Sequence, residues 1–461
     1  MKRLILVKPD LPKEVPLPRY DPEIHLGLGS VAAVLLQEGC QVTIIDNYLH
    51  RLSLVDLVKK ILGGQPNWVG INCDLINIGE VERLASALRS HNIPVVIGGP
   101  EVSINPRATL ERVKGDVAVI GEGEITAKEL VRLDAFTSER LKGVAGTAYL
   151  ENGQYIENPH RPLMKNLDEI PPVPRHLFEM PHYPRQSYEL SESPSDLIST
   201  SRGCPFRCAF CSNEYVWGKK VRAMSPERVA DEVEEMIKTY GTRVLYFRED
   251  NFTIKKKRVY GICEEFLKRE IKVKWLCESR ADHVDEDLLR HMQRAGCRSI
   301  WFGVESGSQR ILDKMHKDIT LAQIKKAFKL SRNAGIIPGA SVMFGMPGET
   351  RAEMKQTFRF LLKISPGYVF FNPFLGIPGS SVFQEIETNN LAYQRFEGLV
   401  LPNNEVMTWP EKVAFTERAT FLFYLFPPNM FSFLRQRGLL YAFQRVRDAF
   451  PKIKTVSHEK S

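Results

Sequence analysis

Three cysteines that could bind a metal lie close together near the middle of the 461-residue chain. Cys204, Cys208 and Cys211 have the spacing C-x3-C-x2-C. A segment this short lets three soft thiolate ligands converge on one metal centre. Structural zinc sites and closed iron–sulfur clusters have four ligands, but the next cysteine, Cys263, lies far downstream in a helical pattern. The motif therefore predicts an iron–sulfur cluster with one open iron, and a zinc knuckle or three unrelated thiols remain the alternatives.

The same segment resembles the signature of radical S-adenosylmethionine (SAM) enzymes, in which an aromatic residue, here Phe210, precedes the last cysteine. The resemblance implies that Cys204, Cys208 and Cys211 are metal ligands and hold a [4Fe–4S] cluster. It implies that the amino and carboxylate groups of SAM chelate the open iron. It also implies an activity, the cleavage of SAM to methionine and a 5′-deoxyadenosyl radical.

Residues 1–135 precede this site, and in them short apolar runs alternate with helical patterns. This alternation predicts a doubly wound, flavodoxin-like domain built on a parallel sheet. In such a sheet, ligands bind in the loops beyond the carboxyl ends of the strands. The expected strands cover residues 4–7, 42–45, 68–72, 95–97 and 117–120.

Glycine-rich motifs at these strand ends resemble the cobalamin (B12)-binding domain that precedes many radical SAM modules. The resemblance implies cobalamin contacts at five positions, which are Gly27, Gly98, Gly99, Gly121 and Glu122. The chain departs from the pattern in two ways. Glu101 replaces the usual His after Gly-Gly-Pro, and the D-x-H-x-x-G motif that supplies an axial His to cobalt elsewhere is missing. A dinucleotide site at residues 27–32 and a domain that has lost its corrinoid are the alternatives.

Residues 136–198 are expected to connect two domains. The Asn152-Gly153 pair predicts a hairpin turn, and a Pro-rich linker follows. Residues 199–400 return to alternating strands and helices, and this pattern suits the partial (βα)6 barrel of the radical SAM family. The six expected strands cover residues 197–200, 244–247, 273–277, 299–304, 341–344 and 368–371.

Polar residues follow the strands of this second region, at the end where barrel enzymes carry their sites. By resemblance to the radical SAM strand-end motifs, SAM contacts are expected from Glu249, Asp250, Arg280, Glu305 and Gly345. Glu249 or Asp250 would bind the amino group, and Arg280 and Glu305 the ribose and carboxylate. An acid at such a position can instead stabilise a helix N-terminus. No catalytic residue is assigned.

Residues 401–461 predict a helical, aromatic-rich extension that closes the open side of the barrel, with peripheral membrane contact as the alternative. The net charge of +8 is not concentrated in a block typical of a nucleic-acid interface, so no nucleic-acid partner is expected. Isolated cysteines in apolar segments suit a reducing compartment. No apolar run of 18 residues is present, so we expect a cytoplasmic protein without a membrane span.

The resemblance extends to about residue 400 and implies a cobalamin-dependent radical SAM methyltransferase. Such an enzyme removes hydrogen from an unactivated carbon and transfers the methyl group of methylcobalamin to it. The expected partners are a small-molecule, lipid or natural-product substrate and an electron donor such as flavodoxin or ferredoxin. Two alternatives remain, a radical cyclisation, rearrangement or oxidation without methyl transfer, and a non-catalytic corrinoid or iron–sulfur sensor.

Overall fold

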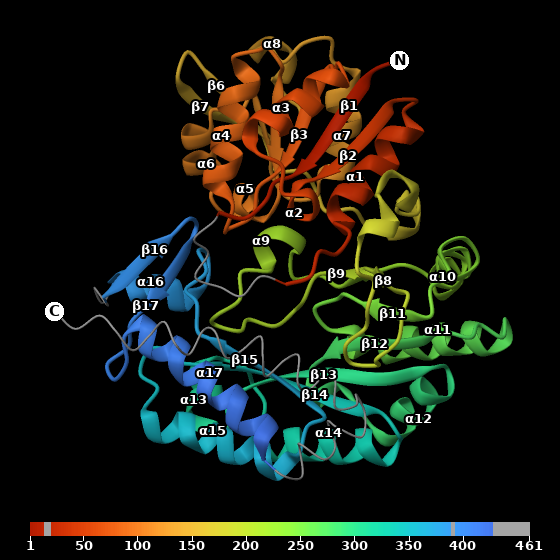
Figure 1. Ribbon diagram of the computed structural model, residues 1–461, viewed down its shortest axis with the longest axis vertical. Helices are drawn as coiled ribbons and strands as arrows, with labels where there is room; N and C mark the ends of the chain where they lie inside the picture. The colour runs from red at the N-terminus through yellow and green to blue at the C-terminus, as the bar shows by residue number, and fades with distance from the viewer. Residues whose placement is uncertain (13–19, 389–391, 427–461) are drawn as a thin grey trace.

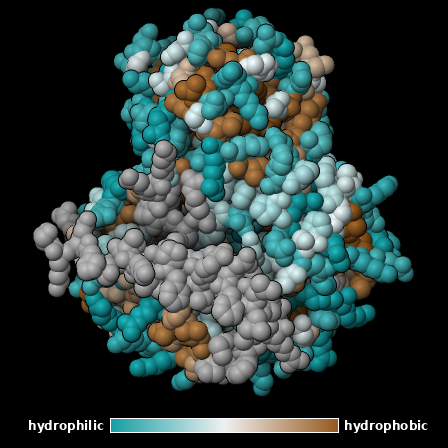
Figure 2. All heavy atoms as spheres, viewed as in Figure 1, coloured by the Kyte–Doolittle hydropathy of each residue, from teal (hydrophilic) through white to brown (hydrophobic). Residues whose placement is uncertain are grey.

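The computed structural model describes residues 1–12, 20–388 and 392–426. Two α/β bodies lie one above the other, with the N-terminal domain at the top of the view and a larger body below it (Figure 1). In Figure 2, hydrophilic residues gather along much of the junction between the two bodies on the visible face.

The N-terminal domain is built on a seven-stranded sheet with the order β2-β1-β3-β4-β5-β6-β7. Its first five strands are parallel and follow the flavodoxin-like order, as the sequence predicts. The strands are β1 (Arg3–Lys8), β2 (Gln41–Asp46), β3 (Trp68–Asn72), β4 (Val95–Gly98), β5 (Val117–Val119), β6 (Thr147–Glu151) and β7 (Gln154–Glu157). The longer helices are α1 (Leu26–Gln37), α3 (Leu54–Gly63), α4 (Ile78–Arg89), α6 (Pro106–Val113) and α7 (Gly123–Arg132), with the short α2 (Asn47–His50), α5 (Pro100–Ile104) and α8 (Ser138–Leu141) between and after them.

The hairpin predicted around Asn152-Gly153 is present, but it is not part of a linker. Strand β6 pairs antiparallel with β5, so the hairpin extends the first sheet. Asn152 and Gly153 have φ values of 50° and 81°, the left-handed conformations that a two-residue turn of this kind requires. The N-terminal sheet therefore continues beyond residue 135, where the sequence placed the end of the domain.

The larger body contains a six-stranded sheet whose order, β8-β11-β12-β13-β14-β15, is the order of the chain. All neighbouring strands are parallel, which gives the predicted partial barrel. The strands are β8 (Ser195–Ile198), β11 (Val244–Phe247), β12 (Lys274–Ser279), β13 (Cys297–Glu305), β14 (Ile337–Phe344) and β15 (Tyr368–Pro373). The helices between them are α10 (Pro226–Tyr240), α11 (Lys256–Lys268), α12 (Glu286–Arg294), α13 (Gln309–Lys314), α14 (Leu321–Asn333) and α15 (Arg351–Ile364).

Local sequence explains why these helices begin where they do. Ser225 caps α10 by accepting a hydrogen bond from the backbone N–H of Arg228, and Pro226 occupies the first helical position. Thr320 and Thr350 open α14 and α15 with capping boxes, in which each threonine and the residue three positions later bond to each other's backbone N–H. The buried faces of these helices pack on alternate residues of the strands and form the largest apolar core of the described chain.

The C-terminal part contains a helix, as the sequence predicts, and also a hairpin that the sequence does not predict. Helix α16 (Ser381–Thr388) precedes an unpredicted hairpin, β16 (Tyr393–Phe396) and β17 (Leu399–Pro402), and then helix α17 (Trp409–Leu425). Phe423 of α17 lies 5.9 Å from Phe371 of β15, between ring centroids. Phe371 belongs to the core beneath the helices, and the Tyr424 hydroxyl of α17 bonds to the backbone N–H and carbonyl of Val369 in β15 at 3.1 and 3.3 Å, so α17 packs along the last strand of the half-barrel.

Residues beyond Phe426, which include the basic and aromatic tail considered for membrane contact, lie outside the described residues. Among the described residues, no helix is long and apolar enough to cross a membrane.

The turn of the β16–β17 hairpin joins the larger body to the N-terminal domain. The backbone N–H of Gly398 donates to the carbonyl oxygen of Leu75 at 2.7 Å. The Glu397 carboxylate accepts from the backbone N–H of Gly79 at 2.9 Å, in the first turn of α4. An acid at a helix N-terminus is favourable, so a side chain from the larger body stabilises a helix of the smaller one.

Candidate active site

The three predicted cluster cysteines lie on one loop at the carboxyl end of β8. The loop follows the short strand β9 (Ser201–Arg202) and leads into helix α9 (Glu214–Trp217). Gly203 has φ +90°, and a side chain there would begin 2.4 Å from the Lys220 carbonyl oxygen. A glycine is therefore required where the loop passes its neighbour. Farther along, the N–H of Ala209 donates to the Met315 carbonyl oxygen at 2.8 Å and fixes the loop against α13.

The loop thiols differ from the other cysteines in their access to solvent. Cys204 and Cys208 are half-buried and Cys211 is exposed, whereas the remaining five cysteines are buried. Partial desolvation raises the pKa of Cys204, and it raises the pKa of Cys211 to about 11. Bound iron would favour the thiolate forms, because coordination deprotonates a thiol. The donor set thus fits a cluster held by three thiolates.

The arrangement is not that of a site for a single ion. Within residues 1–12, 20–388 and 392–426, no three His, Cys, Asp or Glu side chains gather closely enough to hold one metal ion. In a cubane, each cysteine binds a different iron, so its sulfur ligands stand farther apart than the ligands of one ion.

Arg280, a predicted SAM contact, lies beside the cysteine loop. Its Nη1 is 4.0 Å from the Cys208 sulfur, and its guanidinium stacks on the ring of Phe206 at 3.7 Å. Asp282 accepts from its Nε and Nη2, both at 3.0 Å, and the Lys317 carbonyl accepts from Nη2 at 2.7 Å. These contacts hold the buried side chain so that Nη1 points toward the loop.

The structure separates the two acids that follow β11. Glu249 is buried, and its oxygens accept from the backbone N–H of Thr200, from two hydroxyl groups and from Arg258 at 3.1 Å. Asp250 accepts a hydrogen bond at 2.7 Å from the side-chain amide of Asn213, and Asn213 lies two residues after Cys211. The surrounding protein removes part of its water and raises its pKa to about 6. Of the two acids, Asp250 is the one that bonds to the cysteine loop, and its carboxylate has fewer protein partners than that of Glu249.

Two further predicted SAM contacts have protein partners. Glu305 has φ +61°, and its carboxylate accepts from the buried Lys317 ammonium at 2.8 Å. Gly345 has φ +83°; its carbonyl accepts from Lys412 of α17, and a side chain at this position would meet the Lys412 side chain at 2.5 Å. Glu305 and Gly345 therefore support the strand ends through contacts with the protein itself.

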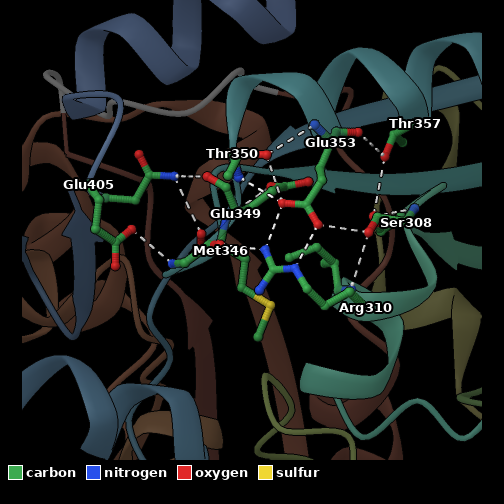
Figure 3. A network of polar contacts seen from close by, with 12 residues as sticks. Ser308, Arg310, Met346, Glu349, Thr350, Glu353, Thr357 and Glu405 are labelled. Carbon is green, nitrogen blue, oxygen red and sulfur yellow. Dashed lines mark hydrogen bonds and ion pairs between the residues drawn. The ribbon is translucent and has the colours of Figure 1, made fainter.

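The segment after β14 is stabilised by two carboxylates (Figure 3). Glu349 is fully buried; one of its oxygens accepts from the backbone N–H groups of Gly345 and Met346, and the other has no partner in the described part of the chain. Glu353 accepts from Ser308 and Arg310 at 2.9 and 2.8 Å, and links this segment to the start of α13. The turn is thereby fixed beside the carboxyl ends of the strands.

The predicted cobalamin contacts gather at the carboxyl ends of the N-terminal strands, except that Gly27 lies within α1. Gly98 ends β4, and Gly99 has φ +119°, where a side chain would begin 2.7 Å from the Cys73 carbonyl oxygen. At Gly121 the φ is +77°, and apart from its chain neighbours no atom of the described residues lies within 4 Å of the point where a side chain would begin. Bare backbone here suits close approach of a large cofactor, so these loops fit a corrinoid.

His25 and Glu101 each bond to the N-terminal domain itself through one side-chain atom. The His25 ring accepts from the backbone N–H of Leu28 at 3.0 Å and caps α1. Glu101 is buried, and one of its oxygens accepts from Asn105 at 3.1 Å and from Thr109 at 3.3 Å. Its other oxygen has no partner within the described residues, and burial raises its pKa.

Glu122 has different partners from those that the sequence predicts. It accepts from Arg202 at 2.9 Å, from Arg222 at 2.6 Å and from the backbone N–H of Met164 at 2.8 Å. Glu124 accepts from the same Arg202 at 2.5 Å. All four side chains in this ion-pair clamp are nearly buried, so the Glu122 carboxylate already has three partners in the protein itself.

The clamp fixes the N-terminal domain against the cluster loop. Arg202 lies two residues before Cys204 and also stacks over the ring of Trp217, at 4.7 Å. Helix α9, which follows the cysteines, contacts α5 of the N-terminal domain. Arg202 and Arg222 cannot be identified as clamp residues from the sequence, because nothing in their spacing indicates a partner 80 or 100 residues away.

Comparison with known proteins agrees with this arrangement. Residues 198–361 match the Radical SAM superfamily, and residues 19–131 match the B12 binding domain. The "Uncharacterized methyltransferase PH0819" of Pyrococcus horikoshii is 35% identical over 370 residues, which cover 79% of each chain. The anaerobic magnesium-protoporphyrin IX monomethyl ester cyclase of Cereibacter sphaeroides is 30% identical over 352 residues, which cover 74% of this chain and 56% of the cyclase.

Among solved structures, the cobalamin-dependent S-adenosylmethionine radical enzyme OxsB, with aqua-cobalamin and S-adenosylmethionine bound, has a similar fold. The TM-score is 0.76 at 19% identity, over 91% of this chain and 66% of that one. With two domain matches and a relative that aligns over most of both chains, the protein belongs to the cobalamin-dependent branch of the radical SAM superfamily.

Proposed function

We propose that the protein methylates an unactivated carbon of a small-molecule substrate. The observation that carries this proposal is the clamp between Arg202 and the residue 121–124 loop. The clamp holds the cysteine loop, which suits a SAM-binding cluster, at the junction between the two domains. The glycine loops that suit a corrinoid lie at the same junction. A radical generated at one and a methyl group held at the other could then reach one substrate carbon.

Each group of residues has a separate task in this proposal. Cys204, Cys208 and Cys211 would hold the cluster, and the backbone around Gly99 and Gly121 would hold cobalamin. When bound, the cluster and SAM would supply the radical, and cobalamin the methyl group.

Asp250 and Arg280 would orient SAM. With a pKa of about 6, the Asp250 carboxylate is mostly ionised at neutral pH and suits the ammonium group of the amino acid moiety. Arg280 directs Nη1 toward the cysteine loop and suits the SAM carboxylate. Because Asp282 fixes the guanidinium from its other side, little side-chain freedom would be lost on binding.

Radical chemistry of this kind needs a reductant, so we propose an electron donor of the flavodoxin or ferredoxin type and a location in the cytoplasm. The proposal is tested by anaerobic reconstitution with iron, sulfide, cobalamin, SAM and a reductant, followed by mass spectrometry of the products from candidate substrates. Methyl transfer increases the product mass by one CH2. Products with unchanged or lower mass would reject methyl transfer.

A second candidate is a radical cyclisation or oxidation without methyl transfer. It is favoured by the similarity to the magnesium-protoporphyrin IX monomethyl ester cyclase, at 30% identity. The same mass measurement separates the two, because ring closure by oxidation removes hydrogen and adds no carbon.

A further inference from the structure

We propose that a small acidic electron-transfer protein docks on a basic rim beside the cysteine loop and delivers the electron that reduces the cluster. This inference deepens the proposed function and rests on it. The basic rim consists of six cations, all at least partly exposed, from the cysteine loop, the segment after α9 and the start of α11. They are Arg207, Lys219, Lys220, Lys255, Lys256 and Lys257.

The segment after α9 runs directly beside the cysteine loop. The backbone N–H of Cys204 donates to the Gly218 carbonyl oxygen at 3.3 Å, and a side chain at Gly203 would collide with the Lys220 carbonyl oxygen. Strand β10 (Arg222–Ala223) continues this segment and pairs antiparallel with β9, which leads into the loop. The lysines of this segment are therefore fixed next to the first predicted cluster ligand.

The start of α11 contacts the same segment. The Lys255 ammonium donates to the Val221 carbonyl oxygen at 2.8 Å, one residue after Lys220. This contact joins lysines that are far apart in sequence into one group. Arg207 belongs to the cysteine loop itself and directly precedes Cys208. The six cations therefore border the loop from two segments and from within it.

Most of the rim charge is not neutralised by the protein. Lys219 pairs with Glu214 at 2.9 Å, and Lys256 pairs with Asp285 at 2.5 Å. The other four cations have no carboxylate partner within residues 1–12, 20–388 and 392–426, and they are Arg207, Lys220, Lys255 and Lys257. The rim therefore keeps an excess of positive charge that a partner could neutralise.

The lysines at the start of α11 are unfavourable for the helix itself. A helix N-terminus carries partial positive charge and favours acids. The first turn of α11 contains no acid, and the side chain of its cap residue, Lys255, accepts no hydrogen bond. By contrast, α10, α12 and α15 each have an acid in the first turn. Helix stability does not explain these lysines, whereas contact with an anionic partner would offset their cost.

The rim lies where an electron donor must approach. Cys211 is exposed, and Cys204 and Cys208 are half-buried, so the loop that would hold the cluster lies close to the surface. Complementary charge steers two proteins together and fixes their orientation. An acidic protein with a reduced flavin or iron–sulfur centre fits this surface. One electron leaves the reduced centre of the donor and enters the oxidised cluster, and no atom is transferred.

Reduction of the reconstituted cluster by the hydroquinone form of flavodoxin, an acidic protein, tests the inference by anaerobic stopped-flow absorbance. Lys220→Glu/Lys257→Glu reverses two exposed charges that have no ion pair within the described residues. At low ionic strength we expect the second-order rate constant to fall about ten-fold or more, as expected for the loss of electrostatic steering. High salt should slow the parent and bring the two rates together. The affinity for oxidised flavodoxin should fall in parallel.

Lys355→Glu/Lys363→Glu is the matched control, because it changes the net charge equally at two other exposed lysines. They lie on α15, which connects β14 to β15 at the opposite edge of the sheet from β8. This variant should be reduced at nearly the parent's rate. Photoreduced 5-deazariboflavin, a small uncharged donor, should reduce the parent and both variants equally fast.

The inference is overturned if flavodoxin reduces Lys220→Glu/Lys257→Glu as fast as the parent at low ionic strength, or if the control variant is slowed as much. It is also overturned if 5-deazariboflavin reduces the rim variant as slowly as flavodoxin does, or if neither flavodoxin nor ferredoxin reduces the parent. A single-stranded RNA oligonucleotide that binds the rim more tightly than flavodoxin would assign the surface to nucleic acid instead. Cluster reduction needs no substrate, so a protein that flavodoxin reduces as expected but that adds no CH2 to any substrate would reject methyl transfer alone.

Discussion

Replacing Glu122 by Gln should loosen the junction between the two domains. The substitution keeps the size of the side chain but removes the charge that neutralises two nearly buried guanidinium groups, those of Arg202 and Arg222. Arg202 keeps Glu124 as a partner, whereas Arg222 retains two backbone carbonyl acceptors, those of Met164 and Trp217, and no carboxylate.

The size of the effect follows from the burial of these side chains. Removing one partner from a buried ion pair costs about 3–5 kcal/mol, because the remaining charge is left without compensation. The contacts that Arg202 and Arg222 retain place the expected loss of unfolding free energy near the lower end, at about 3 kcal/mol. The exposed pair between Glu38 and Arg132 offers a matched control, since Glu38→Gln in the same domain should change stability much less.

Calorimetry of the apoprotein, with limited proteolysis of the segment between the two sheets, measures this effect. We expect Glu122→Gln to unfold at a lower temperature, to separate the two domain transitions and to be cleaved faster than the parent. In the reconstituted enzyme, SAM cleavage should continue while methylated product per cleaved SAM falls. Unchanged apoprotein stability together with weaker cobalamin binding would refute the clamp and return Glu122 to its predicted role as a cobalamin contact.

Two further predictions concern pH. Burial raises the pKa of Glu349 to about 7 from an ordinary value of 4.5, so the stability that its proton contributes is present at low pH and lost as the pH rises through 7. Between pH 4.5 and 7.5, Glu349→Gln should therefore gain up to about 3 kcal/mol relative to the parent in urea denaturation, and a constant difference between the two proteins would contradict this assignment. If Asp250 binds the SAM ammonium, the KM for SAM should rise as the pH falls below about 6, the pKa of that carboxyl group. Asp250→Asn should raise the KM at pH 7.5 and abolish this dependence, and an unaltered pH profile in the variant would exclude Asp250 from SAM binding.

The sequence predicts both sheets well because each strand is a short apolar run between helical patterns. It places the hairpin at Asn152-Gly153 correctly, since the turn chemistry is local. It misses the pairing of that hairpin with β5, because strand pairing depends on which sheet edge is open and not on the hairpin itself. The β16–β17 hairpin is missed for another reason, because Glu397-Gly398 lacks the usual Asn-Gly or Asp-Gly signal.

At the site, the types of residue are predictable from sequence but their partners are not. The spacing of the cysteines limits what they can bind, so the cluster motif can be identified before the fold is known. The acids after the strands all look alike in sequence. Only the structure separates Asp250, beside the cysteine loop, from Glu249 and Glu305, whose partners are Arg258 and Lys317.

The most direct test of the central claim is the electron paramagnetic resonance spectrum of the reconstituted, reduced protein with and without SAM. We expect a reduced [4Fe–4S] signal whose g values shift when SAM is added, because SAM would bind the iron that no cysteine holds. Cys208→Ala should lose that signal or its response to SAM, and Cys40→Ala, at a buried cysteine of the N-terminal domain, should keep both. A signal that SAM leaves unchanged, or one that Cys208→Ala reproduces in full, would show that these three cysteines do not hold a SAM-binding cluster.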